Sequence, residues 1–209
     1  MRPESPILQG GHVRLDPLEP RHTEALVAAS AADPSIYEWS LVPQGREAVE
    51  RYIATALARR DAGTAVPFAT VRLADGAVIG STRFWEIERW AWPAGHARHG
   101  HATPDACEIG YTWLTATAIR SGANTEAKFL MLRYAFESWG VFRVSFHTDA
   151  RNLRSRAALE RLGARQEGLL RAHRMAADHT PRDSMRYSIT LAEWSAVKRR
   201  LEGYLARNA

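Results

Sequence analysis

Cysteine is nearly absent from this chain of 209 residues, and its scarcity excludes two kinds of site. The single cysteine, Cys107, has no partner for a disulfide within the chain. It also leaves no set of thiolates for a structural zinc ion. A catalytic thiol at Cys107 would need a histidine close to it in space. We therefore favour a small buried residue within a strand.

Lysine is almost as rare, because only Lys128 and Lys198 occur among 28 basic residues and the other 26 are arginine. The formal net charge is +5, but the arginines are scattered and form no block of positive charge. A compositional bias toward arginine explains the charge more simply than a nucleic-acid surface does. The planar guanidinium also suits phosphates and carboxylates, so small acidic ligands remain open.

Long hydrophobic runs are missing as well. No apolar stretch is long enough to cross a bilayer, and residues 1–11 lack the apolar segment of a signal peptide. Hydrophobic residues make up 45% and charged residues 24% of the chain, which is typical of globular proteins outside membranes. We therefore expect a cytoplasmic protein with no membrane partner, folded most simply as one domain.

Hydrophobic periodicity predicts alternating strands and helices. The expected strands cover residues 12–18, 66–73, 78–88, 108–114, 141–148, 164–175 and 184–190, and the first is expected at a sheet edge. The expected helices cover residues 20–31, 46–61, 123–139, 152–163 and 191–207. The third helix is apolar on two faces, which is typical of a helix packed on both sides. This order favours one α/β domain with a mixed sheet.

Residues 89–106 are expected to form a long irregular connection that contains His96, His99 and His101. Three histidines so close together raise the question of zinc. The segment is rich in Gly, Ala and Arg and offers no carboxylate or cysteine partner nearby, whereas zinc sites need fixed geometry. We therefore expect no metal here. We also expect this connection to act as a lid over the substrate pocket.

Two turns that open helices stand out between Glu108 and Gly163. The first is IRSGAN, residues 119–124, and the second leads into the helix at Asn152. Unpaired N–H groups and the positive end of the helix dipole make such turns natural seats for phosphate. Asn124 and Asn152 are residues of the type that caps helices. The stretch predicts a site for a phosphate-bearing cofactor with chemistry beside it.

Five segments, taken in their order and spacing, carry a family resemblance. They are GHVRLDPLEPRH, IGSTRF, EIGYTWL, TEAKFLMLRYAFE and NLRSRAALERLGARQEGLLR. They resemble the GNAT acyltransferases and, within these, the RimJ/RimL-type acetyltransferases of ribosomal-protein N-termini. The likeness covers about residues 11–195. It implies a single α+β domain over residues 1–209, with a mixed, mostly antiparallel central sheet flanked by helices and acetyl-CoA as co-substrate.

The resemblance places acetyl-CoA along the first turn and the strand before it. The cofactor motif of the family is Gln/Arg-x-x-Gly-x-Gly/Ala. When its first Gly is set on Gly122, Ile119 and Asn124 depart from it. Main-chain donors of the turn still suit a pyrophosphate. The expected cofactor-binding residues are Tyr111, Trp113, Leu114, Arg120, Ser121, Gly122, Ala123, Asn124, Thr125 and Asn152.

The resemblance also points to Glu108 as the base that deprotonates the acceptor amine through water. A surface carboxylate at a strand end is the alternative. Many GNAT enzymes carry a proton-donating Tyr seven residues after the capping Asn, but Leu159 stands there. Ser155 is the candidate donor instead, or simply a serine of the first helical turn. The expected substrate contacts are Trp39, Trp85, Glu86 and His147, and the last two are weaker candidates for the base.

These residues predict direct transfer of an acetyl group from acetyl-CoA to a primary amine. The acceptor is either a protein N-terminus or a small molecule. The alternative is a module of the same fold that binds acyl-CoA without catalysis. The resemblance leaves a homodimer open, because this branch often forms one. The scattered arginines favour no nucleic-acid partner.

Overall fold

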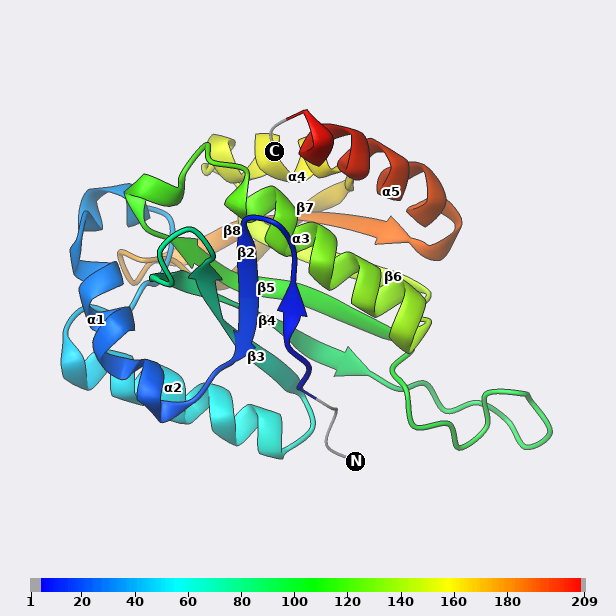
Figure 1. Ribbon diagram of the computed structural model, residues 1–209. Helices are drawn as coiled ribbons and strands as arrows, with labels where there is room; N and C mark the ends of the chain where they lie inside the picture. The colour runs from blue at the N-terminus through cyan, green and yellow to red at the C-terminus, as the bar shows by residue number, and fades with distance from the viewer. Residues whose placement is uncertain (1–4, 208–209) are drawn as a thin grey trace.

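Eight strands form one mixed sheet in the computed structural model, which describes residues 5–207 (Figure 1). The strands are β1 (Leu8–Gln9), β2 (Val13–Pro17), β3 (Ala65–Arg72), β4 (Val78–Glu88), β5 (Ala106–Leu114), β6 (Arg143–Asp149), β7 (Arg165–Met175) and β8 (Pro181–Thr190). Their order is β1-β2-β3-β4-β5-β6-β8-β7, and only β5 and β6 run parallel. The predicted mixed, mostly antiparallel sheet is confirmed.

The prediction of an edge strand at residues 12–18 is wrong. Strand β2 is the second strand of the sheet, because β1 pairs along its outer side. A strand of two residues is too short to show an alternation of apolar and polar residues, so β1 could not be predicted from the sequence.

Helices cover both faces of the sheet (Figure 1). They are α1 (Thr23–Ala31), α2 (Arg46–Asp61), α3 (Ala123–Arg133), α4 (Leu153–Leu162) and α5 (Leu191–Ala206). Helices α1 and α2 pack on one face, and their buried residues form one core cluster. Residues of α3, α4 and α5 belong to the other cluster. Within residues 5–207, none of the helices combines the length and the apolar character needed to span a membrane.

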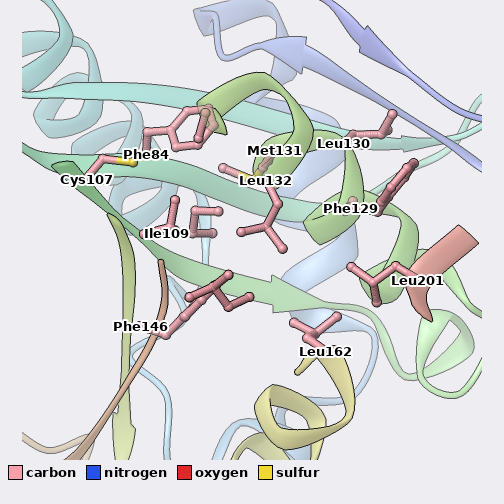
Figure 2. Packing of buried hydrophobic residues seen from close by; sticks show 14 of the residues in the cluster. Phe84, Cys107, Ile109, Phe129, Leu130, Met131, Leu132, Phe146, Leu162 and Leu201 are labelled. Atoms are coloured by element: carbon pink, nitrogen blue, oxygen red, sulfur yellow. The ribbon is translucent and has the colours of Figure 1, made fainter. Parts of the chain in front are cut away.

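Helix α3 is buried on two faces, as its sequence predicted. Met131 and Leu132 are both fully buried, and they lie with strand residues such as Phe84 and Ile109 in the larger cluster (Figure 2). Cys107 is buried in β5 within the same cluster, in agreement with the predicted structural role. Burial raises the pKa of its thiol, so the reactive thiolate is disfavoured at neutral pH.

The connection between β4 and β5 is organised by a buried carboxylate, Asp105. Its oxygens accept hydrogen bonds from the Trp90 amide, the Trp92 indole and the Arg98 guanidinium, at 2.8, 2.9 and 3.0 Å. His101 Nε2 lies 3.3 Å from the same carboxylate. Burial alone would raise the pKa of Asp105, but these hydrogen bonds outweigh it and lower the pKa. The connection is thus fixed by its own hydrogen bonds.

The expectation that the three histidines have no carboxylate nearby is corrected by Asp105. The contact between Asp105 and His101 helps to order the loop. His96 does not join it, because its ring stacks on the Trp92 ring with centroids 4.1 Å apart. Among the described residues, no group of three or more His, Cys, Asp or Glu side chains is arranged to hold a metal ion.

Candidate active site

A cleft opens where strands β5 and β6 separate. The two strands pair only from Ala106 opposite Arg143 to Glu108 opposite Ser145. Beyond Glu108, β6 continues along β8, whereas β5 bends at Tyr111. Tyr111 has a left-handed φ of 53°, and the register between β4 and β5 shifts there, which marks a bulge. The resulting cleft encloses about 1120 Å³.

The connection of residues 89–105 is not a lid over this cleft. It joins the end of β4 to the start of β5, whereas the cleft opens toward the other end of β5. None of its residues lines the cleft. In Figure 1 it projects from the body as a long green loop. The expectation of a lid is therefore wrong.

Glu108 and His147 meet at the point where the strands separate. Glu108 Oε2 lies 2.5 Å from His147 Nδ1, and both side chains are about 95% buried. Both residues line the cleft. The two residues are 39 positions apart in the chain, and the parallel pairing of β5 with β6 brings them together. Glu108 is thus a buried carboxylate with a partner, and the alternative of a surface residue at a strand end is wrong.

The hydrogen bond also defines the state of the imidazole. An ionised carboxylate only accepts hydrogen bonds, so Nδ1 of His147 carries the proton that it donates to Glu108. The other ring nitrogen, Nε2, is buried and has no hydrogen-bond partner among the described residues. In the tautomer that donates from Nδ1, the lone pair of Nε2 is therefore not used by any described residue.

The turn before α3 lies at the cleft, which Arg120, Gly122 and Asn124 line. Arg120 and Gly122 adopt left-handed φ angles of 63° and 79°. A Cβ at Gly122 would meet no atom within 4 Å, so backbone conformation, and not space, favours glycine there. Gly122 is the N-cap and has no side chain of its own to cap the helix, and the hydroxyl of Ser121 accepts the Ala123 N–H only at 3.5 Å. The expectation that Asn124 caps α3 is wrong, because Asn124 lies inside the first turn.

The N-terminus of α4 is closed by a cap, in contrast to that of α3. The side-chain oxygen of Asn152 accepts the backbone N–H of Ser155 at 2.9 Å. Asn152 therefore caps the helix, as predicted. The Ser155 hydroxyl has no hydrogen-bond partner in the described part of the chain, and the half-buried residue lines the cleft. A free hydroxyl at this position is available to a bound molecule.

Most of the predicted site residues share this one cleft. Those that line it are Trp39, Trp85, Glu108, Tyr111, Trp113, Leu114, Arg120, Gly122, Asn124, Thr125, His147, Asn152 and Ser155. Three do not line it. Ser121 donates to the Ala118 carbonyl at 2.7 Å, Ala123 is buried, and Glu86 is exposed and pairs with Arg174.

Several residues that line the cleft carried no signal in the sequence. Arg174 lies over the Trp85 ring at 4.3 Å, and Arg182 lies opposite it across the hairpin of β7 and β8. Scattered arginines gave no reason to single out these two. Lys128 is different, because a lysine within a helix that is apolar on two faces predicts a buried amino group.

Comparison with known proteins identifies the family. The family model described as an acetyltransferase (GNAT) domain matches residues 12–165, well over half of the chain. The chain belongs to the GNAT acetyltransferase family. The predicted GNAT resemblance is therefore confirmed, and with it the class of N-acetyltransferases. None of the curated proteins that were compared matches this GNAT chain.

Solved structures agree with this assignment. A GCN5-related N-acetyltransferase from Brucella melitensis is 28% identical, with a TM-score of 0.80 over 98% of this chain and 87% of that chain. RimJ from Mycobacterium smegmatis, solved in complex with CoA-disulfide, shares the fold. Its TM-score is 0.77 over 95% of this chain and 93% of that chain, at 23% identity.

The GNAT cleft has a buried ammonium group beneath it. Lys128 of α3 is buried, and its Nζ donates to the hydroxyls of Thr82, at 3.1 Å, and Thr112. Burial lowers the pKa of Lys128 to about 7. The charged form thus destabilises the folded protein at pH 7 and below. Between about pH 7 and its ordinary pKa of 10.5, the unfolded chain holds a proton that the folded chain has lost.

Replacement of Lys128 by methionine is therefore expected to stabilise the protein most at low pH. The free energy of unfolding of the wild type rises with pH in this interval, so the advantage of Lys128→Met should shrink by about 2 kcal/mol from pH 7 to pH 9. Urea unfolding at both pH values measures it. Lys198→Met, at a partly exposed lysine paired with Glu137, is the control and should show no such change. An advantage independent of pH would contradict the assigned pKa.

Proposed function

We propose that this GNAT protein transfers an acetyl group from acetyl-CoA directly to a primary amine. The contact between Glu108 and His147 supports the proposal, because a buried carboxylate and the imidazole that it touches both line the cleft. Acyl transfer to an amine needs a base of this kind, since the acceptor enters as an ammonium ion and attacks only after it loses a proton.

The start of α3 and the gap between strands β5 and β6 suit the two parts of acetyl-CoA. Pyrophosphate would bind the uncapped N–H groups at the start of α3, where the helix dipole adds to the attraction. The pantetheine arm would lie between the separated strands β5 and β6. Family membership supports this placement, because GNAT enzymes use acetyl-CoA. The relative solved with CoA-disulfide supports it as well.

In the proposed reaction the Glu108–His147 pair takes a proton from the ammonium group, directly or through water. The amine nitrogen then forms a bond to the thioester carbonyl carbon. The carbonyl oxygen gains negative charge, and main-chain N–H groups near the bulge at Tyr111 would stabilise it. The carbonyl double bond forms again as the C–S bond breaks, and the CoA thiolate takes a proton from the Ser155 hydroxyl. The nitrogen gives up its second proton, directly or through water, to the Ser155 oxygen, which leaves a neutral amide.

The Ser155 hydroxyl supplies a direct test of this last step. We expect Ser155→Ala to lower turnover at saturating substrates by roughly tenfold, because proton donation to a thiolate is helpful but a thiolate leaves readily without it. Thiol release measured with Ser195→Ala, an exposed serine on α5, is the control. A wild-type rate in Ser155→Ala would return this serine to a structural role in the first turn of α4.

Binding and turnover measured together test the function as a whole. Isothermal titration with acetyl-CoA should show binding at one site per chain. Thiol release in the presence of small amines and of short peptides with free N-termini should then show turnover. Binding without turnover on any amine would support the alternative, a module that binds acyl-CoA without catalysis. The buried Glu108–His147 pair favours the enzyme.

A further inference from the structure

Two arginines face each other across the hairpin that forms one wall of the cleft. Arg174 of β7 and Arg182 of β8 are direct cross-strand partners. Both line the cleft. Like charges directly opposite each other on paired strands repel, so the pair costs stability unless negative charge lies between or beside them. This wall of the cleft is therefore a candidate site for a bound anion.

Protein carboxylates satisfy only one of the two arginines. Arg174 Nη2 lies 3.0 Å from Glu86 Oε1, and its guanidinium stacks on Trp85. Arg182 is half-buried, and its one hydrogen bond runs from Nε to the Ser184 hydroxyl at 3.0 Å. Within residues 5–207, no carboxylate lies within ion-pair distance of Arg182. A guanidinium partly removed from water without an anionic partner is unfavourable.

The acidic side chain that acts most strongly on Arg182 is already engaged. Asp149 is buried, and both of its oxygens accept hydrogen bonds from the Arg151 side chain, at 3.0 and 2.8 Å. Asp149 acts on Arg182 through its charge, from beyond ion-pair distance. Burial lowers the pKa of Arg182, while Asp149 and Glu108 act in the opposite direction and Arg174 adds to the lowering. The outer nitrogens of Arg182 have no hydrogen-bond partner among the described residues, so they are available to a bound anion.

The two arginines lie beside the groups that would handle the amine. Arg174 Nη2 is 4.0 Å from Glu108 Oε2, the oxygen that binds His147. The phosphates of CoA belong at the other end of the cleft, at the N-terminus of α3, so they would not neutralise this pair. A carboxylate on the acceptor, a short distance from its amine, would supply this anion.

We propose that the acceptor carries a carboxylate close to its primary amine, and that Arg182 binds this carboxylate with help from Arg174. Free amino acids and peptides with an acidic first residue share this chemistry. The proposal rests on the proposed acetyl transfer and specifies its substrate class. The guanidinium fork binds a carboxylate through two parallel hydrogen bonds, which would also orient the amine toward Glu108 and His147.

Matched acids and amides test the proposal. Thiol release from acetyl-CoA is measured with a panel of amino acids, each beside its own carboxamide. A second arm uses tetrapeptide amides that begin with aspartate or with asparagine. We expect one arm to show a preference for the acid in kcat/KM of roughly 10- to 100-fold, the range of a charge-assisted hydrogen bond. The arm that shows it identifies the source of the carboxylate.

Variants then assign the preference to the arginine. Arg182→Gln should abolish it, mainly by raising KM for the acid, whereas the amide should react as in the wild type. Arg182→Lys keeps the charge and should retain part of the preference. Arg171→Gln, at an exposed position of the same hairpin, is the control and should keep all of it. Equal rates for acid and amide in the wild type, or a preference that survives in Arg182→Gln, would overturn the proposal.

A binding arm separates this proposal from the proposed acetyl transfer. Tryptophan fluorescence reports on the cleft through Trp39 and Trp85, which line it. N-acetylated amino acids and their amides are titrated into the protein with CoA present. Tighter binding of the acids supports the carboxylate site even if no amine is acetylated. Equal binding overturns it, and a failure to bind acetyl-CoA at all would instead contradict the proposed function.

Discussion

Glu108→Gln is expected to lower turnover by roughly 100- to 1000-fold while the dissociation constant for acetyl-CoA stays within about twofold of the wild type. The amide is close in shape to the carboxylate, so the packing of β5 against β6 should survive. It cannot accept the ammonium proton, and it weakens the hydrogen bond that orients His147. Steady-state thiol release and isothermal titration measure the two quantities.

The matched control is Glu88→Gln, an exposed carboxylate at the loop end of β4, which should leave turnover unchanged. The dependence of kcat/KM on pH decides between a role in proton transfer and a role in folding. Loss of a group that must be deprotonated should remove the fall in rate at low pH. An unchanged pH–rate profile in Glu108→Gln would exclude this residue from the mechanism.

His147→Gln distinguishes the two members of the pair. If Glu108 is the base and His147 only orients it, this variant should lose less turnover than Glu108→Gln. If the proton passes through Nε2, the two variants should be equally slow, and the double variant no slower, because members of one unit are not additive.

Sequence periodicity was sufficient for the strands of the sheet other than β1 and for the buried helix α3. Local patterns fail where a contact depends on tertiary pairing. Glu108 was noticed as the opening residue of EIGYTWL, but its burial depends on His147, which the parallel pairing of β5 and β6 brings to it. The arginines of the hairpin are a similar case, because their cross-strand register is not encoded in any local period.

The wrong expectations have equally physical causes. Residues 89–106 were expected to cover the substrate as a long irregular connection, but the direction of β4 and β5 places them at the far end of the sheet. Asn124 was expected to cap α3 because of its residue type. The left-handed turn at Gly122 starts the helix two residues earlier. Topology and backbone conformation decided both outcomes.

The other large effect is expected at Glu126, a buried carboxylate in the first half of α3. Its two oxygens accept three backbone hydrogen bonds from the turn between β1 and β2. The donors are the N–H groups of Gly11, His12 and Val13, at 2.8, 2.8 and 2.7 Å. The chain approaches so closely that a Cβ at Gly10 would lie 2.3 Å from the carboxyl carbon. Glu126 thus fastens the first hairpin of the sheet to the helix that begins at the cleft.

Glu126→Ala should lower the free energy of unfolding by about 3 kcal/mol or more, because three N–H groups lose an ionic acceptor in a mostly buried place. For a chain of this size that corresponds to a fall in Tm of roughly 6–12 °C. Glu126→Gln keeps one acceptor oxygen but turns an NH₂ group toward a donor, so its loss should be smaller. Glu202→Gln, exposed on α5, should melt like the wild type.

Thermal and urea unfolding distinguish this role from one in catalysis. A melting temperature for Glu126→Ala within about 1 °C of the wild type would contradict the anchoring role. Where the variant remains folded at 25 °C, weaker binding of acetyl-CoA is also expected. The carboxylate holds α3 against β2 one turn after Gly122, so its loss would free the N–H groups of that turn from their fixed direction. The same side chain would then support both the fold and the cofactor end of the cleft.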